Sequence, residues 1–583
     1  MLKRLASSVR DFKTASILTL LFIVGEAIIE TFIPFITADL INYIRDAGNA
    51  LEMERILWTG LLLVGMAALS LTCGGVAAYT CAKASSGFAR NLRNDVFDKI
   101  QAFSFQNVDK FSATSLVTRL TTDVNNIQMS YMMIIRIAIR APLILVFSII
   151  MAFYMGGLLA LSFVVLIPLL TMGLFLVSRK AMPAFRAVFR KYDRLNESIE
   201  ENVRAARVVK GFSRENYEKE KFGAAAEDIR GDFTRAERIV ACNNPLMQLC
   251  VNANMIFVLA VGSQLIVRSG GAALNVGDMS AMLTYGMQIL MQLMMLNMIY
   301  VMLTMSAESM KRVNEVLTEQ SNLVSPANAV TEVRDGSVDF KNVSFKYSEK
   351  ADRYALADVD LHIKSGMTVG ILGGTGSSKS TLVQLIPRLY DATKGVVKVG
   401  GVDVRAYDLD TLRGQVAMVL QKNLLFSGTI KENLRWGNEN ATDEELIEAC
   451  KLAQAHDFVA SFPDGYNTHI EQGGTNVSGG QKQRLCIARA LLKKPKILIL
   501  DDSTSAVDTK TDALIRAGFK SYIPETTKII IAQRVSSVQD ADLILVMENG
   551  AVAAQGTHSE LLTSCDIYRE IYEQQTKGGE EHE

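Results

Sequence analysis

Residues 373–381 read Gly373-Gly374-Thr375-Gly376-Ser377-Ser378-Lys379-Ser380-Thr381. They follow an apolar, strand-like run, Thr368–Leu372, and precede a helix-like run, Leu382–Leu389. This order of strand, glycine-rich loop and helix is typical of a phosphate-binding loop, because successive backbone N–H groups and the helix N-terminus attract anions. A chance turn rich in glycine and serine is the alternative, but it does not explain the Lys-Ser-Thr ending.

Three side chains of this loop have predicted consequences for nucleotide binding. Lys379 is expected to reach the β- and γ-phosphates, and the hydroxyl of Ser380 is expected to ligate Mg²⁺. Ser378 stands where such loops usually carry glycine. Its β-carbon is expected to tighten or distort the cradle around the phosphates.

Two further motifs follow in an order that supports ATP chemistry. The apolar run Ile497–Leu500 predicts a buried strand of a parallel sheet, and Asp501 at its end is expected to hold Mg²⁺ through the ion's water shell. The turn Val477-Ser478-Gly479-Gly480-Gln481 precedes a helical run, Lys482–Leu492, and offers N–H donors and a hydroxyl to an anion. An ordinary helix N-cap is the alternative for that turn.

The N-terminal half has the composition of a membrane domain. The chain has 583 residues, is 49% hydrophobic and carries no formal net charge, so it gives no support for nucleic-acid binding. Its seven cysteines include no CxxC pair and are expected to be free thiols in a reducing compartment. A bilayer span needs about 20 apolar residues. Six stretches qualify: 15–44, 56–80, 130–154, 157–178, 246–268 and 277–305.

Positive charge gathers in two stretches between these apolar runs, 83–128 and 179–238. The positive-inside rule places both in the cytoplasm, together with the basic N-terminal residues 1–13. The helical pattern of both stretches predicts membrane helices that extend far into the cytoplasm, with tips near Gln106–Phe111 and Gly211–Tyr217. The apolar stretch that follows residue 13 is too long for a signal-peptide core, so a membrane helix is expected there.

Together these features resemble a half-transporter of the ABC superfamily, of the exporter type. The resemblance spans nearly the whole chain and implies a six-helix α transmembrane domain with two coupling helices over residues 1–320. It implies a linker over 321–335 and an α/β nucleotide-binding domain of the P-loop NTPase type over 336–583. It also implies ATP and Mg²⁺ as cofactors, and a multi-pass position in the cell membrane with the nucleotide-binding domain in the cytoplasm.

The resemblance assigns roles to residues outside the phosphate loop. Tyr347 corresponds to the aromatic residue that stacks on adenine, and Gln421 to the glutamine that joins Mg²⁺ and the attacking water to the membrane domain. Glu471 matches a loop that contacts the coupling helices. The turn Ser505-Ala506-Val507-Asp508 matches the family pattern beyond the magnesium aspartate. Ser478–Gln481 matches the signature that completes an ATP site on a partner subunit, and comprises Ser478, Gly479, Gly480 and Gln481.

Two positions depart from the family pattern where hydrolysis takes place. The residue after the magnesium aspartate is normally Glu, which acts on the attacking water, and here it is Asp502. Asp is shorter by one C–C bond, about 1.5 Å, and a misplacement of about 1 Å can lower a rate by about 10²-fold. Gln533 stands in place of the switch His; it can still hydrogen-bond the γ-phosphate but cannot carry a proton near neutral pH. The chain's own site is therefore expected to bind ATP and to hydrolyse it slowly or not at all.

This asymmetry resembles the weak-site subunit of heterodimeric bacterial multidrug exporters. The implied partner is a second, non-identical half-transporter with an intact catalytic Glu and switch His. The intact signature of this chain would complete the partner's active site, and hydrolysis there would reset the pump.

Polar and flexible side chains in the apolar stretches suggest a substrate path. Glu26 and Glu30 lie one turn apart on the first membrane helix, and intramembrane carboxylates often mark functional sites. They could face a cavity for cationic compounds, or pair with Arg136 or Arg140. The last membrane helix carries methionines on one face, which suits either a cavity for varied amphipathic compounds or helix packing. These are Met287, Met291, Met294, Met298, Met302 and Met305.

The function expected from these observations is ATP-driven export of small amphipathic or drug-like molecules across the lipid bilayer by a heterodimer. Export of lipid or peptide by the same fold is one alternative. Import of a siderophore-like ligand and a non-catalytic, ATP-sensing regulatory or channel subunit are two others.

Overall fold

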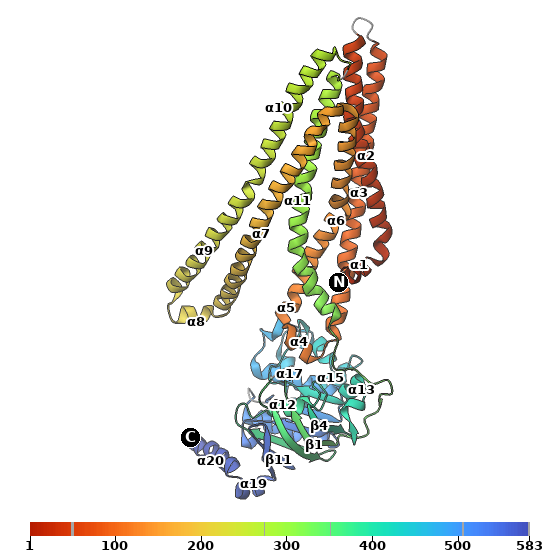
Figure 1. The fold of residues 1–583 in the computed structure, drawn as a ribbon. Coiled ribbons are helices and arrows are strands. Elements are labelled where there is room, and N and C mark those ends of the chain that lie inside the picture. Colours follow the sequence, from red (N-terminus) through yellow and green to blue (C-terminus); the bar gives the residue numbers. More distant parts are fainter. Residues whose placement is uncertain (48–51, 273, 350, 504–506, 581–583) are drawn as a thin grey trace. The chain divides into compact units, whose positions relative to one another are not determined.

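The computed structural model describes residues 1–47, 52–272, 274–349, 351–503 and 507–580. The chain forms two compact units, which are drawn in Figure 1. The first comprises Met1–Ala102 and Phe111–Glu319, and the second comprises Phe103–Lys110 and Gln320–Glu583. The segment Phe103–Lys110 therefore belongs to the second unit, although it lies inside the predicted 1–320 domain.

The first unit is built from long helices. Five helical segments in the described part of the chain are long and apolar enough to cross a membrane. One of these, Ala113–Phe185, is broken by a 3-10 turn at Gly157–Ala160, where Gly157 has a φ of 47°. The helices are α1 (Leu2–Ser7), α2 (Lys13–Ala47), α3 (Met53–Gln101), α5 (Ala113–Thr118), α6 (Val124–Gly156), α7 (Leu161–Arg204), α8 (Ala206–Gly211), α9 (Glu215–Ala241), α10 (Asn243–Ser269) and α11 (Val276–Thr318). The six predicted apolar stretches correspond to α2, α3, α6, α7, α10 and α11.

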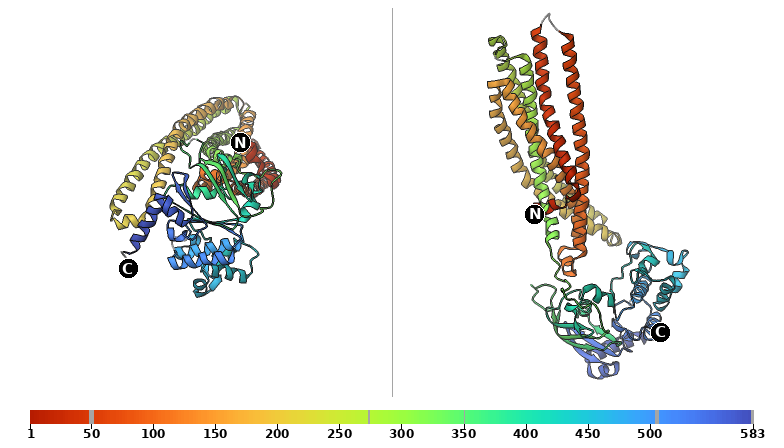
Figure 2. Two further views of the ribbon diagram at one scale, coloured as in Figure 1. Left: turned by 90° about the horizontal axis from the view of Figure 1, so that it is seen from below. Right: turned by 90° about the vertical axis from the view of Figure 1, so that its right-hand side faces the viewer.

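The length of these helices carries them well beyond a bilayer. The 49 residues of α3 span about 70 Å, whereas a hydrocarbon core is about 30 Å thick. α2 and α3 run side by side (Figure 1, Figure 2). The predicted cytoplasmic tip near residues 211–217 is formed by α8 and the turn that leads into α9. The tip predicted at 106–111 is the short helix α4 (Phe105–Phe111).

In its described residues, the second unit contains three sheets. The central six-stranded sheet has the order β12-β11-β3-β10-β9-β6, in which β12 runs antiparallel to β11 and the other neighbours are parallel. A four-stranded antiparallel sheet has the order β2-β1-β4-β5, and β7 pairs with β8. The strands are β1 (Val338–Phe345), β2 (Leu356–Ile363), β3 (Thr368–Gly373), β4 (Lys394–Val399), β5 (Val402–Asp403), β6 (Val416–Val419), β7 (Gly428–Thr429), β8 (His469–Ile470), β9 (Ile497–Asp501), β10 (Thr527–Ile531), β11 (Leu543–Glu548) and β12 (Ala551–Gly556).

The helices of the second unit cover the sheets and include several short ones. Besides α4 they are α12 (Lys379–Gln384), α13 (Leu409–Gln415), α14 (Ile430–Arg435), α15 (Asp443–Leu452), α16 (His456–Ser461), α17 (Gly479–Leu492), α18 (Thr509–Tyr522), α19 (His558–Ser564) and α20 (Asp566–Glu580). Parallel strands that are covered on both faces have continuous apolar sequences, which is why the run 497–500 predicts such a strand.

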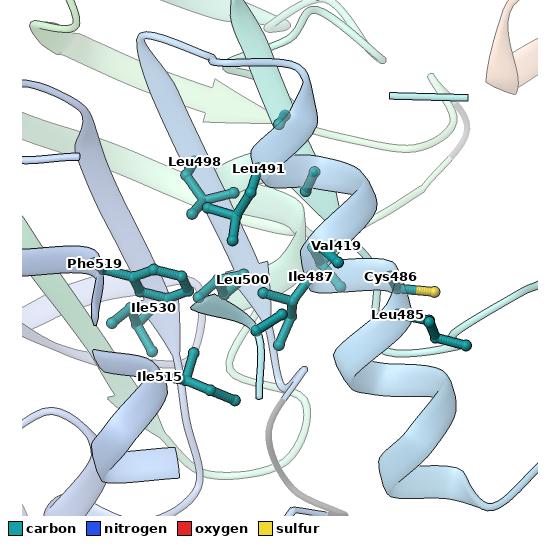
Figure 3. Packing of buried hydrophobic residues seen from close by; sticks show 14 of the residues in the cluster. Val419, Leu485, Cys486, Ile487, Leu491, Leu498, Leu500, Ile515, Phe519 and Ile530 are labelled. Carbon is teal, nitrogen blue, oxygen red and sulfur yellow. The ribbon is translucent and has the colours of Figure 1, made fainter. Parts of the chain in front are cut away.

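Alternate side chains of β9 enter two different hydrophobic clusters. Leu498 and Leu500 pack with Ile487 of α17 and Phe519 of α18, as Figure 3 shows. Ile497 and Ile499 belong to the cluster on the other face of the sheet. Because both faces are packed, the carboxyl end of β9 is held rigidly. That end carries the acidic pair of the candidate site, Asp501 and Asp502.

Candidate functional site

The carboxyl ends of β3, β9 and β10 meet at one edge of the central sheet. A cavity of about 420 Å³, the phosphate cavity, lies there. It is lined by the phosphate loop and by residues at or beyond the ends of β6, β9 and β10. Gln421, Asp501, Asp502 and Gln533 all line it. Residues far apart in sequence, expected from a motif or from the family resemblance to act on a nucleotide, are therefore in one cavity.

The phosphate loop has backbone conformations that favour glycine at three places. Gly373 has a φ of 150°, Gly376 has a φ of 83°, and Ser378, the N-cap of α12, has a φ of 69° and a ψ of 25°. This left-handed region costs an L-residue roughly 1–2 kcal/mol. Because position 378 has this left-handed conformation, glycine is expected there. The serine at this position therefore adds local backbone strain.

Lys379 lies inside the curve of the loop. Its Nζ donates hydrogen bonds of 2.8 Å to the carbonyl oxygens of both Gly373 and Gly374. Burial lowers the pKa of Lys379, and the nearby carboxylates of Asp501 and Asp502 oppose that shift. A bound polyphosphate would supply the negative charge that this half-buried ammonium favours.

Ser380 and Asp501 form a pair suited to a hard divalent cation. The Ser380 hydroxyl donates a 3.0 Å hydrogen bond to Oδ1 of Asp501, which is only 4% exposed. Burial raises the pKa of Asp501, and the Ser380 hydrogen bond partly offsets the rise. Hydroxyl and carboxylate oxygens are the donors that Mg²⁺ takes beside nucleotide phosphates. The donor set therefore fits Mg²⁺, which would neutralise phosphate charge when bound.

Asp502 is held by two glutamine side chains. Its backbone has a φ of 49°, and its Oδ2 accepts a 2.8 Å hydrogen bond from Nε2 of Gln533. Nε2 of Gln421 lies 3.4 Å from the same oxygen, which makes a weaker contact. Asp502 and Gln533, which stand where the family resemblance implies Glu and His, thus contact each other directly through one carboxylate oxygen.

Tyr347 lies beside the phosphate loop and not in the phosphate cavity. Its hydroxyl is 2.8 Å from Oγ1 of Thr381, and its ring packs edge-on against Phe345 and Tyr390 at centroid distances of 4.9 and 5.3 Å. Tyr347 is 45% exposed. The ring lines a neighbouring cavity of about 270 Å³ together with Tyr390.

The signature lies at the start of α17. The Ser478 hydroxyl accepts from the backbone N–H of Gln481 at 3.3 Å, and the Gln481 side chain accepts from the N–H of Ser478 at 2.8 Å. This reciprocal capping leaves the N–H groups of Gly479 and Gly480 at the positive end of the helix dipole. Among the described residues that line the phosphate cavity, none comes from Ser478–Gln481.

The turn beyond the acidic pair is described only in part. Ser505 and Ala506 lie outside the described residues. Asp508 caps α18 by accepting a 2.9 Å hydrogen bond from the N–H of Thr511, and this backbone hydrogen bond is the largest cause that lowers the pKa of Asp508.

Sequence reasoning missed contributions from three residues. Ile571 of the C-terminal helix lines the phosphate cavity, and Gln575 of the same helix contacts the backbone beside Gln533. Tyr390 joins Tyr347 to α4, since its hydroxyl donates a 2.8 Å hydrogen bond to Asp109. No local pattern around these residues indicates a nucleotide site, because each acts only through contacts made by folding.

The membrane-domain candidates lie on α2, α6 and α11. Nη2 of Arg140 is 2.6 Å from a carboxylate oxygen of Glu30 and 3.3 Å from one of Glu26, so a single guanidinium bridges both carboxylates. This geometry corresponds to the pairing alternative. Met287, Met291, Met298 and Met305 are exposed, whereas Met294 and Met302 are half-buried. The methionine face is therefore largely available for a ligand or for another chain.

Comparison with known proteins agrees with this architecture. Residues 16–294 match the family of the ABC transporter transmembrane region, and residues 356–505 match the ABC transporter family that covers the ATP-binding domain. The uncharacterised ABC transporter ATP-binding protein YfiB of Bacillus subtilis is 36% identical over 575 residues, which cover 98% of each chain. The chain belongs to the ABC transporter family. An uncharacterised ABC transporter ATP-binding protein of Mycobacterium tuberculosis is 33% identical over 576 residues, or 98% of this chain and 97% of that one.

A solved structure supports the exporter-type fold of this ABC transporter. A bacterial Atm1-family ABC exporter with ATP bound has a TM-score of 0.82 and 26% sequence identity, and the match covers 97% of this chain and 98% of that one. The chain is therefore an exporter-type ABC half-transporter, a multi-pass membrane protein with a cytoplasmic ATPase domain. Its family hydrolyses ATP to drive transport.

Proposed function

We propose that this ABC half-transporter is the weak-site subunit of a heterodimeric exporter. Its own phosphate loop binds MgATP, with Lys379 on the phosphates and Ser380 and Asp501 around the metal. Its signature, Ser478–Gln481, completes the catalytic site of a second, non-identical half-transporter. The observation that carries the proposal is the contact between Gln533 and Asp502, because it ties both substituted positions to each other at 2.8 Å.

The contact accounts for slow hydrolysis in physical terms. The oxygen of a general base must lie about 2.6–3.2 Å from the oxygen of the attacking water. Asp502 is shorter than Glu, and one of its oxygens already accepts from Gln533. Gln533 cannot replace the proton-carrying histidine either. A homodimer would contain two such sites, which favours pairing with an unlike chain.

Two exposed apolar surfaces support the need for a second subunit. In the nucleotide-binding unit, a groove of about 360 Å³ is lined by Leu424, Phe426 and Trp436, and Trp436 is 67% exposed. In the membrane unit, the tip at α8 displays Val208 and Phe212, and Phe212 is 76% exposed. Exposed apolar patches of this kind mark interaction sites. We propose that each surface contacts its counterpart on the partner subunit.

The transported compounds are proposed to be small, amphipathic or drug-like molecules. The exposed methionines of α11 support this class, since Met is flexible and adapts to varied apolar shapes. The carboxylate pair Glu26 and Glu30 shares one guanidinium, which leaves one negative charge available when both carboxylates are ionised. That charge would favour cationic compounds.

ATPase activity in nanodiscs tests the proposal. Three samples are compared: this chain alone, this chain with a half-transporter that carries Glu and His at the two positions, and the pair with Asp502→Glu plus Gln533→His. We expect a near-zero rate alone, a strong rate for the pair, and a further rise for the double substitution. Stimulation by amphipathic cations then tests the substrate class.

A robust rate for the chain alone would contradict the proposal, because Asp502 would then be a working base. A low rate with the partner present, even after both substitutions, would instead favour a regulatory or channel subunit.

A further inference from the structure

The C-terminal helix α20 is anchored in the core by its first half. Tyr568 is fully buried, and its hydroxyl lies 2.7 Å from Nδ1 of His558 in α19. Leu561 and Cys565 enter the same hydrophobic cluster, and Ile571 packs against it. The position of the helix on this unit is therefore set by packing before its second half reaches the nucleotide site.

The second half of α20 contacts the segment that follows β10 through one side chain. Oε1 of Gln575 accepts a 2.8 Å hydrogen bond from the backbone N–H of Val535. Nε2 of Gln575 donates a 2.9 Å hydrogen bond to the backbone carbonyl of Gln533. The primary amide thus pairs with a backbone donor and a backbone acceptor on either side of Arg534, as a neighbouring strand would.

Direct contacts connect this pairing with the phosphate cavity. The backbone of Gln533 is fixed by Gln575, and the side chain of Gln533 donates to Asp502 at 2.8 Å. Ile571, one turn earlier on α20, lines the phosphate cavity itself. Direct contacts therefore link α20, which Tyr568 anchors in the core, to the Asp502 carboxylate in the cavity.

We propose that Gln575 is a positioning residue for the weak nucleotide site. It fixes the backbone at residues 533–535 so that the Gln533 amide lies on Asp502, and α20 thereby controls how long the site retains nucleotide. The proposal rests on the proposed binding of ATP at this phosphate loop. It predicts that the effect of Gln575 passes through the side chain at position 533.

A purely structural role for Gln575 predicts something different. If the residue only attached α20 to the unit, its loss would change nucleotide retention to the same extent whatever side chain occupied position 533. A double-substitution cycle separates these cases, because coupled residues give non-additive effects and independent ones do not.

The test measures dissociation of a fluorescent ATP analogue, mant-ATP, with Mg²⁺ from the full-length chain in nanodiscs. Gln575→Ala is compared with the unchanged protein, and both are then made in a Gln533→Ala background. Loss of a hydrogen-bonded clamp is expected to speed dissociation about threefold or more. In the Gln533→Ala background, Gln575→Ala is expected to add no further change.

Two more variants sharpen the test. Gln575→Glu keeps the acceptor for the Val535 N–H but places carboxylate oxygen against the Gln533 carbonyl, so it should also speed dissociation. Gln574→Ala is the matched control, since the Gln574 side chain donates to Glu570 of its own helix at 3.4 Å and the rate should stay unchanged. Hydrogen exchange at Val535 should accelerate in Gln575→Ala and not in Gln574→Ala.

Three results would overturn the proposal: an unchanged rate in Gln575→Ala, equal acceleration in both backgrounds, or the same acceleration in Gln574→Ala. Failure of the unchanged protein to bind mant-ATP would contradict the proposed function first, and this inference would fall with it.

Discussion

Ser378 occupies a left-handed backbone position next to the lysine of the phosphate loop. Replacing it with glycine removes strain of roughly 1–2 kcal/mol, but the freer unfolded chain takes back about 0.4–1 kcal/mol. We expect Ser378→Gly to stabilise the nucleotide-binding unit by about 0.5–1 kcal/mol, seen as a higher midpoint of thermal unfolding. Ser377→Gly is the control, because Ser377 is not among the described residues with a positive φ. Equal shifts in both variants would show that strain at 378 is not the cause.

The buried charge of Asp501 should lower the stability of the folded protein, although the same carboxylate is expected to support the binding of MgATP. Burial raises the pKa of Asp501, so the folded protein holds a proton there more tightly than the unfolded chain does. The free energy of unfolding contributed by this site is therefore lost as pH rises through the raised pKa. We expect the neutral variant Asp501→Asn to raise the unfolding midpoint of the nucleotide-free protein at pH 7. The same variant should lose the stabilisation that MgATP gives, which a thermal shift assay measures directly.

A matched control for that variant is Asp512→Asn. Asp512 is also 4% exposed, but its carboxylate pairs with Arg516 at 3.2 Å and accepts from Ser537. Removing a charge that is paired should lower the unfolding midpoint. If both variants shift the midpoint in the same direction, burial of the Asp501 charge is not the reason.

The order of motifs along the chain identifies candidate site residues, although it does not test their roles. The motifs point to Lys379, Ser380 and Asp501, the family resemblance adds Gln421, and all four line one cavity. The contact between Gln533 and Asp502 has no such signal, since it depends on the positive φ of Asp502 and on the rotamers of both side chains. The sequence suggests only that the Gln533 amide could reach the γ-phosphate.

At the scale of elements, α4 should be fixed to the nucleotide-binding unit by Tyr390. The Tyr390 hydroxyl donates to Asp109, and its ring lies 6.1 Å from that of Phe105. A hydrogen bond to a charged group contributes about 1.5–3 kcal/mol. We expect Tyr390→Phe to speed hydrogen exchange at residues 105–110 by about tenfold or more, measured by mass spectrometry on the full chain.

The control for α4 is Tyr354→Phe, which changes a tyrosine of the same unit whose ring stacks with Lys346 at 4.6 Å. It should leave exchange at residues 105–110 unchanged. Unaltered exchange in Tyr390→Phe as well would mean that the aromatic contact, and not the hydroxyl, holds α4.

The six apolar stretches are visible in the sequence because a bilayer demands length and apolar character from each helix. The membership of Phe103–Lys110 in the second unit is not visible there. It depends on contacts across 281 positions of sequence, between Tyr390 and Asp109. Local composition carries no information about such a pairing.

At the scale of the whole molecule, the groove around Trp436 should govern assembly. Trp436 stacks on Phe426 at a centroid distance of 4.2 Å and remains largely exposed. We expect Trp436→Glu to weaken association with the partner half-transporter by about tenfold or more, since a charge in an apolar contact is costly. Co-purification from nanodiscs at several concentrations measures the loss. Binding of mant-ATP by the chain alone should be unchanged, and unchanged association would contradict the role of the groove.

Family and architecture are accessible from the sequence, whereas assembly and substrate are not. The phosphate loop and signature are local in sequence, whereas the surfaces proposed to contact a partner, at Trp436 and Phe212, are exposed only as a result of folding.

The placement of Phe103–Lys110 has a practical consequence for the laboratory. A soluble fragment cut at the apparent domain boundary, from residue 320 onward, would lack the segment that packs on Tyr390. The aromatic cluster of Phe345, Tyr347 and Tyr390 would then lose part of its cover. Such a fragment should be less soluble, and its nucleotide affinity should differ from that of the intact protein. Supplying residues 103–110 as a peptide, or by fusion to the fragment, should restore both properties.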